Sequence, residues 1–268
     1  MLELYPERRD TSPELLASGL RLGDRAPAER PYLALNMVST LDGKATIEWR
    51  TKGLSTELDR RLFHQLRTQV DAVMIGAGTA RVERYGRIAK SEELRAKRMS
   101  EGLAPEPLAI IASGRLDLPA DLPLLQEPEQ EVVIATGSDA VLRGTAARIE
   151  YLRTGDDLPL LMATLREERG VRSILCEGGP TLLRELVEQI ARAHGGERVR
   201  HRHAEVVVAM HAPHRLVGIG HLLADLADQL AELLRHRVPH RVRDVDGGGA
   251  RVNHCLQHSH ATIGTGEQ

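Results

Sequence analysis

The sequence predicts an α/β fold: a sheet flanked by helices. Two of its buried-strand patterns run directly into glycines and then into a helix. Strands that are apolar on both faces are typical of a parallel sheet covered on both sides. Helical patterns separate most of the strand patterns, an alternation that predicts such a sheet, and the strand patterns lie at 32–38, 70–75, 107–112, 131–136 and 174–176.

Composition indicates a folded chain without a strong bulk charge. The 268 residues are 41% hydrophobic and 28% charged, which is enough to bury a core. The 36 basic and 38 acidic residues give a net charge of −2, which argues against nucleic-acid and anionic-membrane partners. With two cysteines and no apolar run of about 18 residues, we expect a cytoplasmic protein.

The chain begins with an extension at 1–30, which mixes charges with prolines and to which we assign no chemistry. Tyr32–Val38 is the first strand, and the chain then leaves it through Asp42-Gly43, a turn signal. A helix begins at Thr56, because Thr56 and Asp59 can form a capping pair and leucines recur behind them at helical spacing.

The first glycine turn follows the strand pattern that begins at Val70, and it reads Gly76-Ala77-Gly78-Thr79. A helix that starts beside bare glycine backbone presents unpaired N–H groups and the positive end of its dipole, which suits a pyrophosphate. A lone Gly-x-Gly is weak evidence and is not the Rossmann fingerprint, so a plain turn is the alternative.

The middle of the chain supplies the next elements. Ala89–Glu101 is densely charged and is interpreted as a solvated helix or insertion. The strand at Pro107–Ala112 ends at Ser113-Gly114-Arg115, where a hydroxyl and a guanidinium fork can take a 2′-phosphate; a surface turn is the alternative. Further on we expect a strand, a helix, a short strand and a helix at 131–136, 140–149, 151–153 and 158–168.

The second glycine turn is Gly178-Gly179, between the apolar run Ile174–Cys176 and a helix whose first turn holds Pro180 and Thr181. If the strands before both turns are parallel neighbours, their carboxyl ends face one crevice. A dinucleotide phosphate can then lie between two helix N-termini.

Three segments also resemble the signature segments of the riboflavin-biosynthesis reductase domain: Pro31–Lys44, Asp71–Thr79 and Leu175–Leu182. The resemblance covers about 31–190 and implies the dihydrofolate-reductase-like fold, with a mixed, mostly parallel sheet flanked by helices. It implies an NADPH-dependent reductase that transfers hydride to a ribosylamino-pyrimidine or related small heterocycle, in the family at the sugar C1′. Members commonly dimerise, so a homodimer is expected.

The glycine turns and the resemblance together give the candidate site. Ser113 and Arg115 are expected at the 2′-phosphate. The reacting end is assigned to Ser39, Asp42 and Glu177; Asp42 can orient or protonate the substrate, and Glu177 can bond the sugar hydroxyls or brace the turn. No metal ligands are assigned in this domain. The remaining cofactor-binding candidates are Gly76, Ala77, Gly78, Thr79, Gly178, Gly179, Pro180 and Thr181.

One segment departs from the family pattern. Arg81–Tyr85 stands where the family shows a paired-acid Asp-Pro segment that helps to hold the substrate. This departure leaves the expected cofactor site intact but leaves the exact substrate open, and it resembles a divergent subgroup of pyrimidine-type reductases.

The composition changes after the second glycine helix: 11 of the 12 histidines lie in 189–268, and the last lysine is Lys97. We therefore expect a tail at 191–268 that is divergent or the product of a shifted reading frame, with a faint strand pattern at Glu205–Met210 and an amphipathic helix at Leu222–His236. Two other functions stay open: a catalytically silent protein with a regulatory or assembly role, and a metal-binding protein. The second is suggested by histidines four residues apart at 236 and 240 and at 254 and 258.

Overall fold

The computed structural model describes residues 2–3, 9–39, 53–193, 205–212 and 215–217. The chain separates into Met1–Arg237 and Val238–Gln268, and the second unit lies outside the described residues. The predicted helix at Leu222–His236 and the four spaced histidines also lie outside them.

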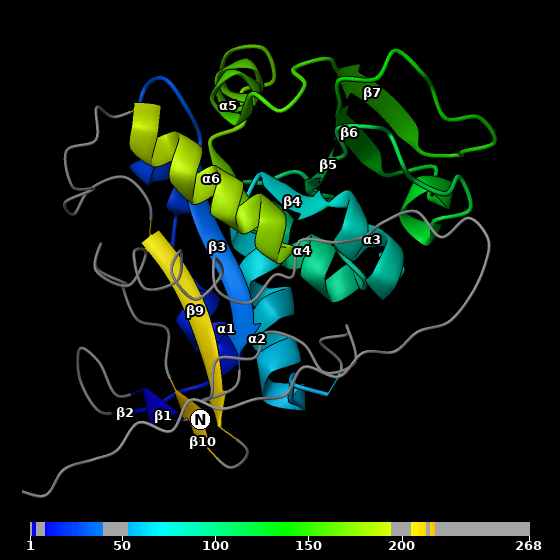
Figure 1. The fold of residues 1–268 in the computed structure, drawn as a ribbon. Coiled ribbons are helices and arrows are strands. Elements are labelled where there is room, and N and C mark those ends of the chain that lie inside the picture. Colours follow the sequence, from blue (N-terminus) through cyan, green and yellow to red (C-terminus); the bar gives the residue numbers. More distant parts are fainter. Residues whose placement is uncertain (1, 4–8, 40–52, 194–204, 213–214, 218–268) are drawn as a thin grey trace, which may run out of the picture. The chain divides into compact units, whose positions relative to one another are not determined.

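The described strands form an eight-stranded sheet in the order β10-β9-β3-β8-β4-β5-β6-β7 (Figure 1). Every neighbouring pair is parallel except β9 and β10, so the predicted mixed, mostly parallel sheet is confirmed. A separate antiparallel pair joins β1 (Leu2–Glu3) to β2 (Arg9–Asp10). The strands of the sheet are β3 (Tyr32–Ser39), β4 (Ala72–Gly76), β5 (Leu108–Ala112), β6 (Glu131–Ala135), β7 (Arg148–Leu152), β8 (Ser173–Cys176), β9 (Glu205–Ala212) and β10 (Arg215–Val217).

The strand order reverses at the centre of the sheet. Strands β4 to β7 follow one another outward, and β8 then returns to lie between β3 and β4. This return makes neighbours of β4 and β8, the two strands that end in glycine turns.

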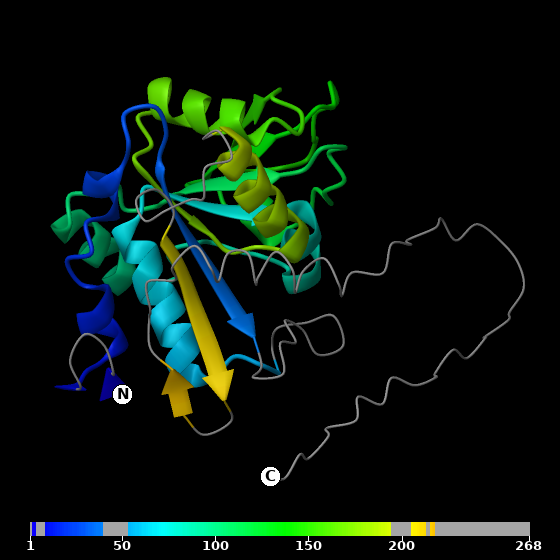
Figure 2. The ribbon, with the colours of Figure 1, turned by 60° about the vertical axis from the view of Figure 1, so that its left-hand side comes forward.

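Helices cover both faces of the sheet (Figure 2). In β4, Val73 and Ile75 belong to a core cluster with the leucines of α2, whereas Met74 belongs to a second cluster with the leucines of α5 and α6. This alternation is what a strand buried on both faces requires. The α-helices are α1 (Pro13–Ala17), α2 (Glu57–Leu66), α3 (Ala77–Glu83), α4 (Glu92–Ser100), α5 (Leu158–Glu167) and α6 (Pro180–Ala193), and short 3₁₀ turns lie at Leu22–Arg25 (η1), Arg67–Gln69 (η2) and Pro123–Gln126 (η3).

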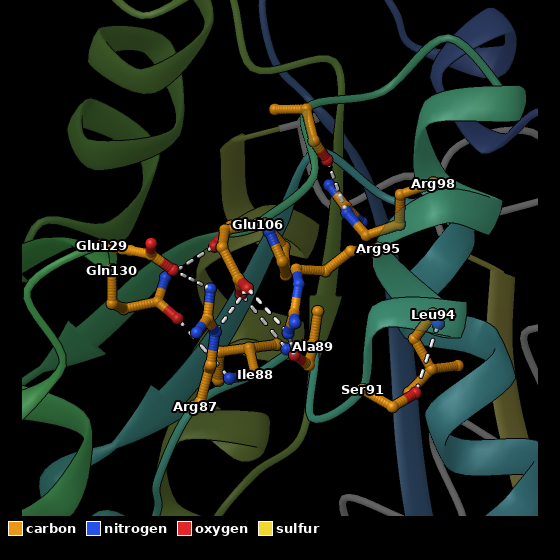
Figure 3. Close-up of polar contacts among 12 residues, drawn as sticks. Arg87, Ile88, Ala89, Ser91, Leu94, Arg95, Arg98, Glu106, Glu129 and Gln130 are labelled. Carbon is orange, nitrogen blue, oxygen red and sulfur yellow. Dashed lines mark hydrogen bonds and ion pairs between the residues drawn. The ribbon is translucent and has the colours of Figure 1, made fainter.

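Side-chain caps fix four of the described helix starts, and Ser12 caps α1 through the N–H of Leu15. The Thr56 hydroxyl accepts the N–H of Asp59, which confirms the predicted start of α2. Ser91 caps α4 through the N–H of Leu94 (Figure 3), and Asp157 caps α5. Each cap satisfies one of the N–H groups that a first helical turn leaves unpaired.

The helix predicted at Ala140–Ile149 is wrong. Arg148–Leu152 is instead strand β7, paired in parallel with β6 from Glu131 opposite Arg148 onward. Before the strand, Gly144 has φ +76°, and the N–H groups of Ala146 and Ala147 donate to the Leu125 carbonyl. Pairing with β6 and with the Leu125 carbonyl therefore overrides the local helical tendency of this segment.

The prediction that Ala89–Glu101 is a solvated charged segment is wrong for Arg98, which is 1% exposed. Its guanidinium donates to the carbonyls of Arg67, Val70 and Ala104 and so joins α4 to the turn that precedes β4. Figure 3 shows the adjoining polar cluster, in which the Glu106 carboxylate accepts from Arg87 Nε at 2.6 Å and from the N–H of Ala89 at 3.3 Å.

The strand pattern expected at Glu205–Met210 is present in β9. It pairs in parallel with β3, from Ala34 opposite Glu205 to Ser39 opposite Met210, and β10 pairs antiparallel with β9. Strand β3 therefore lies inside the sheet, between β9 and β8.

Replacing Arg98 is expected to destabilise the fold. Arg98→Met keeps much of the side-chain volume but leaves three carbonyls without their donor, so the free energy of unfolding should fall by about 2–4 kcal/mol. Urea unfolding measures it, with the exposed Arg143→Met as the matched control. Equal unfolding curves for the two variants would contradict a structural role for Arg98.

Candidate functional site

A cleft of about 560 Å³ lies at the carboxyl ends of the central strands. In an open α/β sheet this edge, at the point where the strand order reverses, is where ligands bind, and the volume is typical of a small-molecule or cofactor site. Its lining comes mostly from residues at or just after the ends of β4, β5, β6, β7 and β8, namely 76–79, 112–115, 135, 155–156 and 179–182, with Arg81, Asp117, Leu158 and Glu185.

The two glycine turns touch each other beside this cleft. The N–H of Gly76 donates to the carbonyl of Gly178 at 2.7 Å. Gly178 has φ +90°, a conformation that favours glycine, and the Gly178–Gly179 peptide is cis. A Cβ on Gly179 would stand 2.6 Å from Thr79 Oγ1. Glycine is therefore favoured at 178 by its backbone conformation and at 179 by the close contact with Thr79.

The groups around these turns suit a phosphate. Helix α6 begins at Pro180 directly after the second turn, so the N–H groups of its first turn and the positive end of its dipole face the cleft side of the sheet. Thr79 adds a hydroxyl at the cleft wall. A Cβ on Gly78 would meet nothing within 4 Å, so bare backbone lies open there. This donor set and shape fit a dinucleotide phosphate.

The residues predicted to bind the 2′-phosphate lie farther along the same cleft, after β5. Ser113 is 6% exposed at the end of the strand, and Arg115 is exposed in the turn beyond it. Among the described residues no carboxylate lies within ion-pair distance of Arg115, whereas Arg81 is paired with Asp117 at 2.9 Å. Arg115 thus presents an uncompensated cation to the cleft.

The structure brings together almost all of the predicted cofactor-binding residues. Gly178 does not line the cleft; it is buried and holds Gly76 through its carbonyl. Whether the others bind a cofactor stays a prediction. The predicted residues that line the cleft are Gly76, Ala77, Gly78, Thr79, Ser113, Arg115, Gly179, Pro180 and Thr181.

The predicted reacting end is described only in part. Ser39 is the last residue of β3, and its side chain is outside the described set, as is the whole of Asp42. In register, Leu35 pairs with Cys176, so β3 continues past the end of β8 at the edge of the sheet that carries the cleft.

Glu177 lies in a buried ion pair. Its oxygens accept from Arg67 Nε at 2.7 Å and Nη2 at 2.8 Å, and from the Tyr85 hydroxyl at 2.9 Å. The Arg67 and Glu177 side chains are 5% and 1% exposed. Burial lowers the pKa of Arg67, but the charge and hydrogen bonds of Glu177 outweigh it, and the net pKa is raised. With both oxygens engaged, these contacts favour the bracing alternative for Glu177.

Tyr85 belongs to the segment that departs from the family pattern. Its hydroxyl donates to Glu177, and its pKa is raised well above 10, first by burial and then by the Glu177 charge. The phenol is therefore a hydrogen-bond donor at neutral pH. The altered segment thus contacts the residue next to the second glycine turn.

His64 lies on α2 beside this ion pair. Its pKa is lowered to about 4, first by burial and then by the charges of Arg67 and Lys90. Its Nδ1 is buried without a hydrogen-bond partner, and its ring lies 5.6 Å from that of Phe63, centroid to centroid. The imidazole is therefore neutral near pH 7.

Several cleft residues were missed by the sequence reasoning. Arg81 and Glu185 lie four residues after Ala77 and Thr181, one helical turn on, so helical spacing would have indicated them. Asp156 follows Gly155 just before the cap of α5, where Gly-Asp-Asp is a turn signal. The pKa of Glu185 is raised, first by partial burial and then by Asp156 and Glu188, against the effect of Arg184.

The described part of the chain offers neither a metal cluster nor a membrane-spanning helix. No three histidine, cysteine, aspartate or glutamate side chains there are grouped so as to hold a metal ion. No helix in that part has the length and apolar character needed to cross a membrane.

The chain is similar in sequence to a known family and to named reductases. A family model described as the RibD C-terminal domain matches residues 31–190. The 2,5-diamino-6-ribosylamino-4(3H)-pyrimidinone 5′-phosphate reductase of Archaeoglobus fulgidus is 32% identical over 165 residues, 60% of this chain and 75% of that protein. The protein of the same name from Methanothermobacter thermautotrophicus is 30% identical over 159 residues, 57% of this chain and 69% of that protein.

Solved structures show the same fold. A pyrimidine reductase-like protein from Corynebacterium diphtheriae superposes with a TM-score of 0.53 at 19% identity, over 78% of this chain and 83% of that one. A deaminase/reductase from Thermotoga maritima superposes with a TM-score of 0.51 at 21% identity, over 71% of this chain and 48% of that one. At these identities the likeness concerns the fold.

Breaking the buried ion pair should destabilise the protein more than removing its phenol. Glu177→Gln leaves the Arg67 charge uncompensated, so we expect the free energy of unfolding to fall by about 3–5 kcal/mol. Tyr85→Phe removes one hydrogen bond to a charged group and should lower it by about 1–2 kcal/mol. Chemical denaturation with the exposed Glu168→Gln as control tests the order, and a Tyr85→Phe effect as large as that of Glu177→Gln would refute it.

His64 should make stability depend on pH in the acid range. Its folded pKa of about 4 lies below the ordinary 6.5, so the folded state binds fewer protons between these values. Stability should therefore decline as pH falls below 6.5 and level off below about 4. His64→Gln should reduce that decline by about 1–2 kcal/mol, a value discounted because the ring is partly exposed. Parallel wild-type and variant curves of unfolding free energy against pH would disprove the assignment.

Proposed function

The chain belongs to the RibD C-terminal domain family, and from this we propose that it is an NADPH-dependent reductase of the riboflavin-biosynthesis type. We take its substrate to be 2,5-diamino-6-ribosylamino-4(3H)-pyrimidinone 5′-phosphate, the compound in the names of the relatives that are 30% and 32% identical. The observation that carries the proposal is the meeting of two glycine turns in a cleft at the strand-order reversal.

The chain's own residues would hold the cofactor by its phosphates. The bare backbone at Gly78 and Gly179, the first turn of α6 and the Thr79 hydroxyl would supply donors along the cleft, whereas Gly76, whose N–H already donates to Gly178, would shape the cleft wall. The contact between the turns fixes these donors before any ligand arrives, which reduces the ordering that binding requires. Bound NADPH would supply a hydride to the ribosyl C1′ of the substrate.

The preference for NADPH is assigned to Ser113 and Arg115. A guanidinium offers a fixed fork of donors that matches phosphate oxygens. Arg115 is exposed in the cleft without a carboxylate partner among the described residues, so its charge is available to a 2′-phosphate.

The reacting end would be formed by Ser39 and Asp42, on the loop that leaves β3. The register of β3 against β8 supports this, since β3 continues beyond the second glycine turn at the same edge of the sheet. Glu177 would act through position, by holding Gly178 and Gly179 against Arg67 and Tyr85.

We also propose that the protein is a cytoplasmic homodimer. The dimer rests on the family resemblance, and the location rests on the low cysteine content. Sedimentation equilibrium of the full chain distinguishes a dimer from a monomer.

The proposed function is tested by binding and turnover together. NADPH should raise the apparent melting temperature by mass action, and the substrate should gain one hydride and one proton by mass spectrometry only when NADPH is present. A folded protein that does not bind NADPH would overturn the proposal. Binding without turnover would favour the catalytically silent alternative.

Gly78→Leu provides a sharper variant. A side chain at Gly78 enters open space, so the fold should tolerate it while the cleft is obstructed. We expect NADPH affinity to fall at least about tenfold with the unfolding free energy changed by less than about 1 kcal/mol. Glu93→Leu, on the exposed side of α4, is the control for an added leucine. Unchanged NADPH affinity in Gly78→Leu would remove this turn from the binding site.

A further inference from the structure

Three strand-end loops form the part of the cleft beyond the glycine turns. The carbonyl of Gly114, after β5, accepts from the Thr136 hydroxyl at 3.0 Å and from the N–H of Gly137 at 3.1 Å. The N–H of Gly155, after β7, donates to the Thr136 carbonyl at 3.3 Å. These bonds hold the loop that carries Asp156 against the turn that carries Arg115.

Asp156 presents its carboxylate directly over that turn. A Cβ on Gly114 would stand 2.9 Å from Asp156 Oδ1, so the carboxylate occupies the space that a side chain at 114 would fill. The backbone of Asp156 is fixed, because its carbonyl accepts from Gln189 Nε2 at 3.1 Å and from the N–H of Leu158. Its carboxylate has no hydrogen bond or ion pair among the described residues and lies exposed in the cleft.

The other two cleft carboxylates are placed differently. Asp117 is paired with Arg81 at 2.9 Å, which offsets its charge. Glu185 lies on α6 one turn after Thr181, near enough to Asp156 for its pKa to be raised in part by that charge. Asp156 is therefore the carboxylate that lies beside Gly114, and Gly114 stands between Ser113 and Arg115 in the sequence.

Asp156 and Arg115 favour opposite cofactors. A carboxylate accepts hydrogen bonds from the hydroxyls of an adenosine ribose and repels a 2′-phosphate, whereas a guanidinium attracts that phosphate. Dinucleotide sites commonly contain one of these selectors; this cleft holds both on adjoining loops.

We propose that Asp156 is a specificity residue of the cofactor site: it accepts from the adenosine ribose of NADH and weakens the preference for NADPH that Arg115 gives. This inference rests on the proposed function, since it concerns the same cleft and the same class of ligand.

Cofactor affinity measured directly tests the inference. Asp156→Asn keeps the shape and removes the charge, so the ratio of the NADPH to the NADH association constant should rise about tenfold. Arg115→Gln should lower the ratio by a similar factor. Fluorescence titration of each dinucleotide against the full chain gives the dissociation constants, and kcat/KM for the two cofactors should follow them. Asp139→Asn, an exposed carboxylate outside the cleft, is the matched control.

The outcomes separate this inference from the proposed function. If wild type binds NADPH and Asp156→Asn changes the ratio no more than Asp139→Asn does, the inference is overturned and the proposed function stands. If neither dinucleotide binds folded wild-type protein, both fall. Asp156→Ser, which also removes the charge, should shift the ratio in the same direction, and a shift toward NADH would overturn the inference.

Discussion

The cleft depends on the buried ion pair between Arg67 and Glu177. Arg67 lies in the turn after α2, and Glu177 directly precedes Gly178, so the pair ties the second glycine turn to the segment that leads into β4. Arg67 also stacks on Phe63 at 4.2 Å, and its own carbonyl accepts from Arg98 of α4. Two charges removed from water remain favourable only with such geometry and additional hydrogen bonds. The second glycine turn is thus held by a buried polar network.

Most of the fold and the centre of the site could be predicted because their signals are local. Buried strands are short apolar runs, and the glycine turns at 76–79 and 178–179 stand next to their strands in sequence. What the sequence left open depends on partners far along the chain. Arg67 and Glu177 are 110 residues apart, and nothing local indicates that they meet. Asp156 was missed for the same reason, because its importance depends on its position over Gly114, which is far from it in the sequence.

The failed predictions have the same cause. The segment before β7 has a locally helical composition, but β6 presents an open strand edge, and pairing with it satisfies more backbone groups than an isolated helix would. Arg98 was predicted to be solvated because it stands in a run of charges. It is buried because its guanidinium donates to carbonyls around the 3₁₀ turn at Arg67–Gln69. In both places tertiary hydrogen bonding decided against the local pattern.

The insertion of β8 between β3 and β4 has a consequence for biosynthesis. Strands β3 and β4 touch β8 and not each other, so the centre of the sheet is completed only when residues 173–176 have left the ribosome. Strands β4 to β7 pair in sequence order and can associate earlier. Strand β3 cannot pair with β8 until more than a hundred further residues have been synthesised. Closing that long loop is slow and leaves apolar strand edges uncovered during synthesis. The edges of β3 therefore stay unpaired until residues 173–176 and, on its other side, residues 205–212 are available.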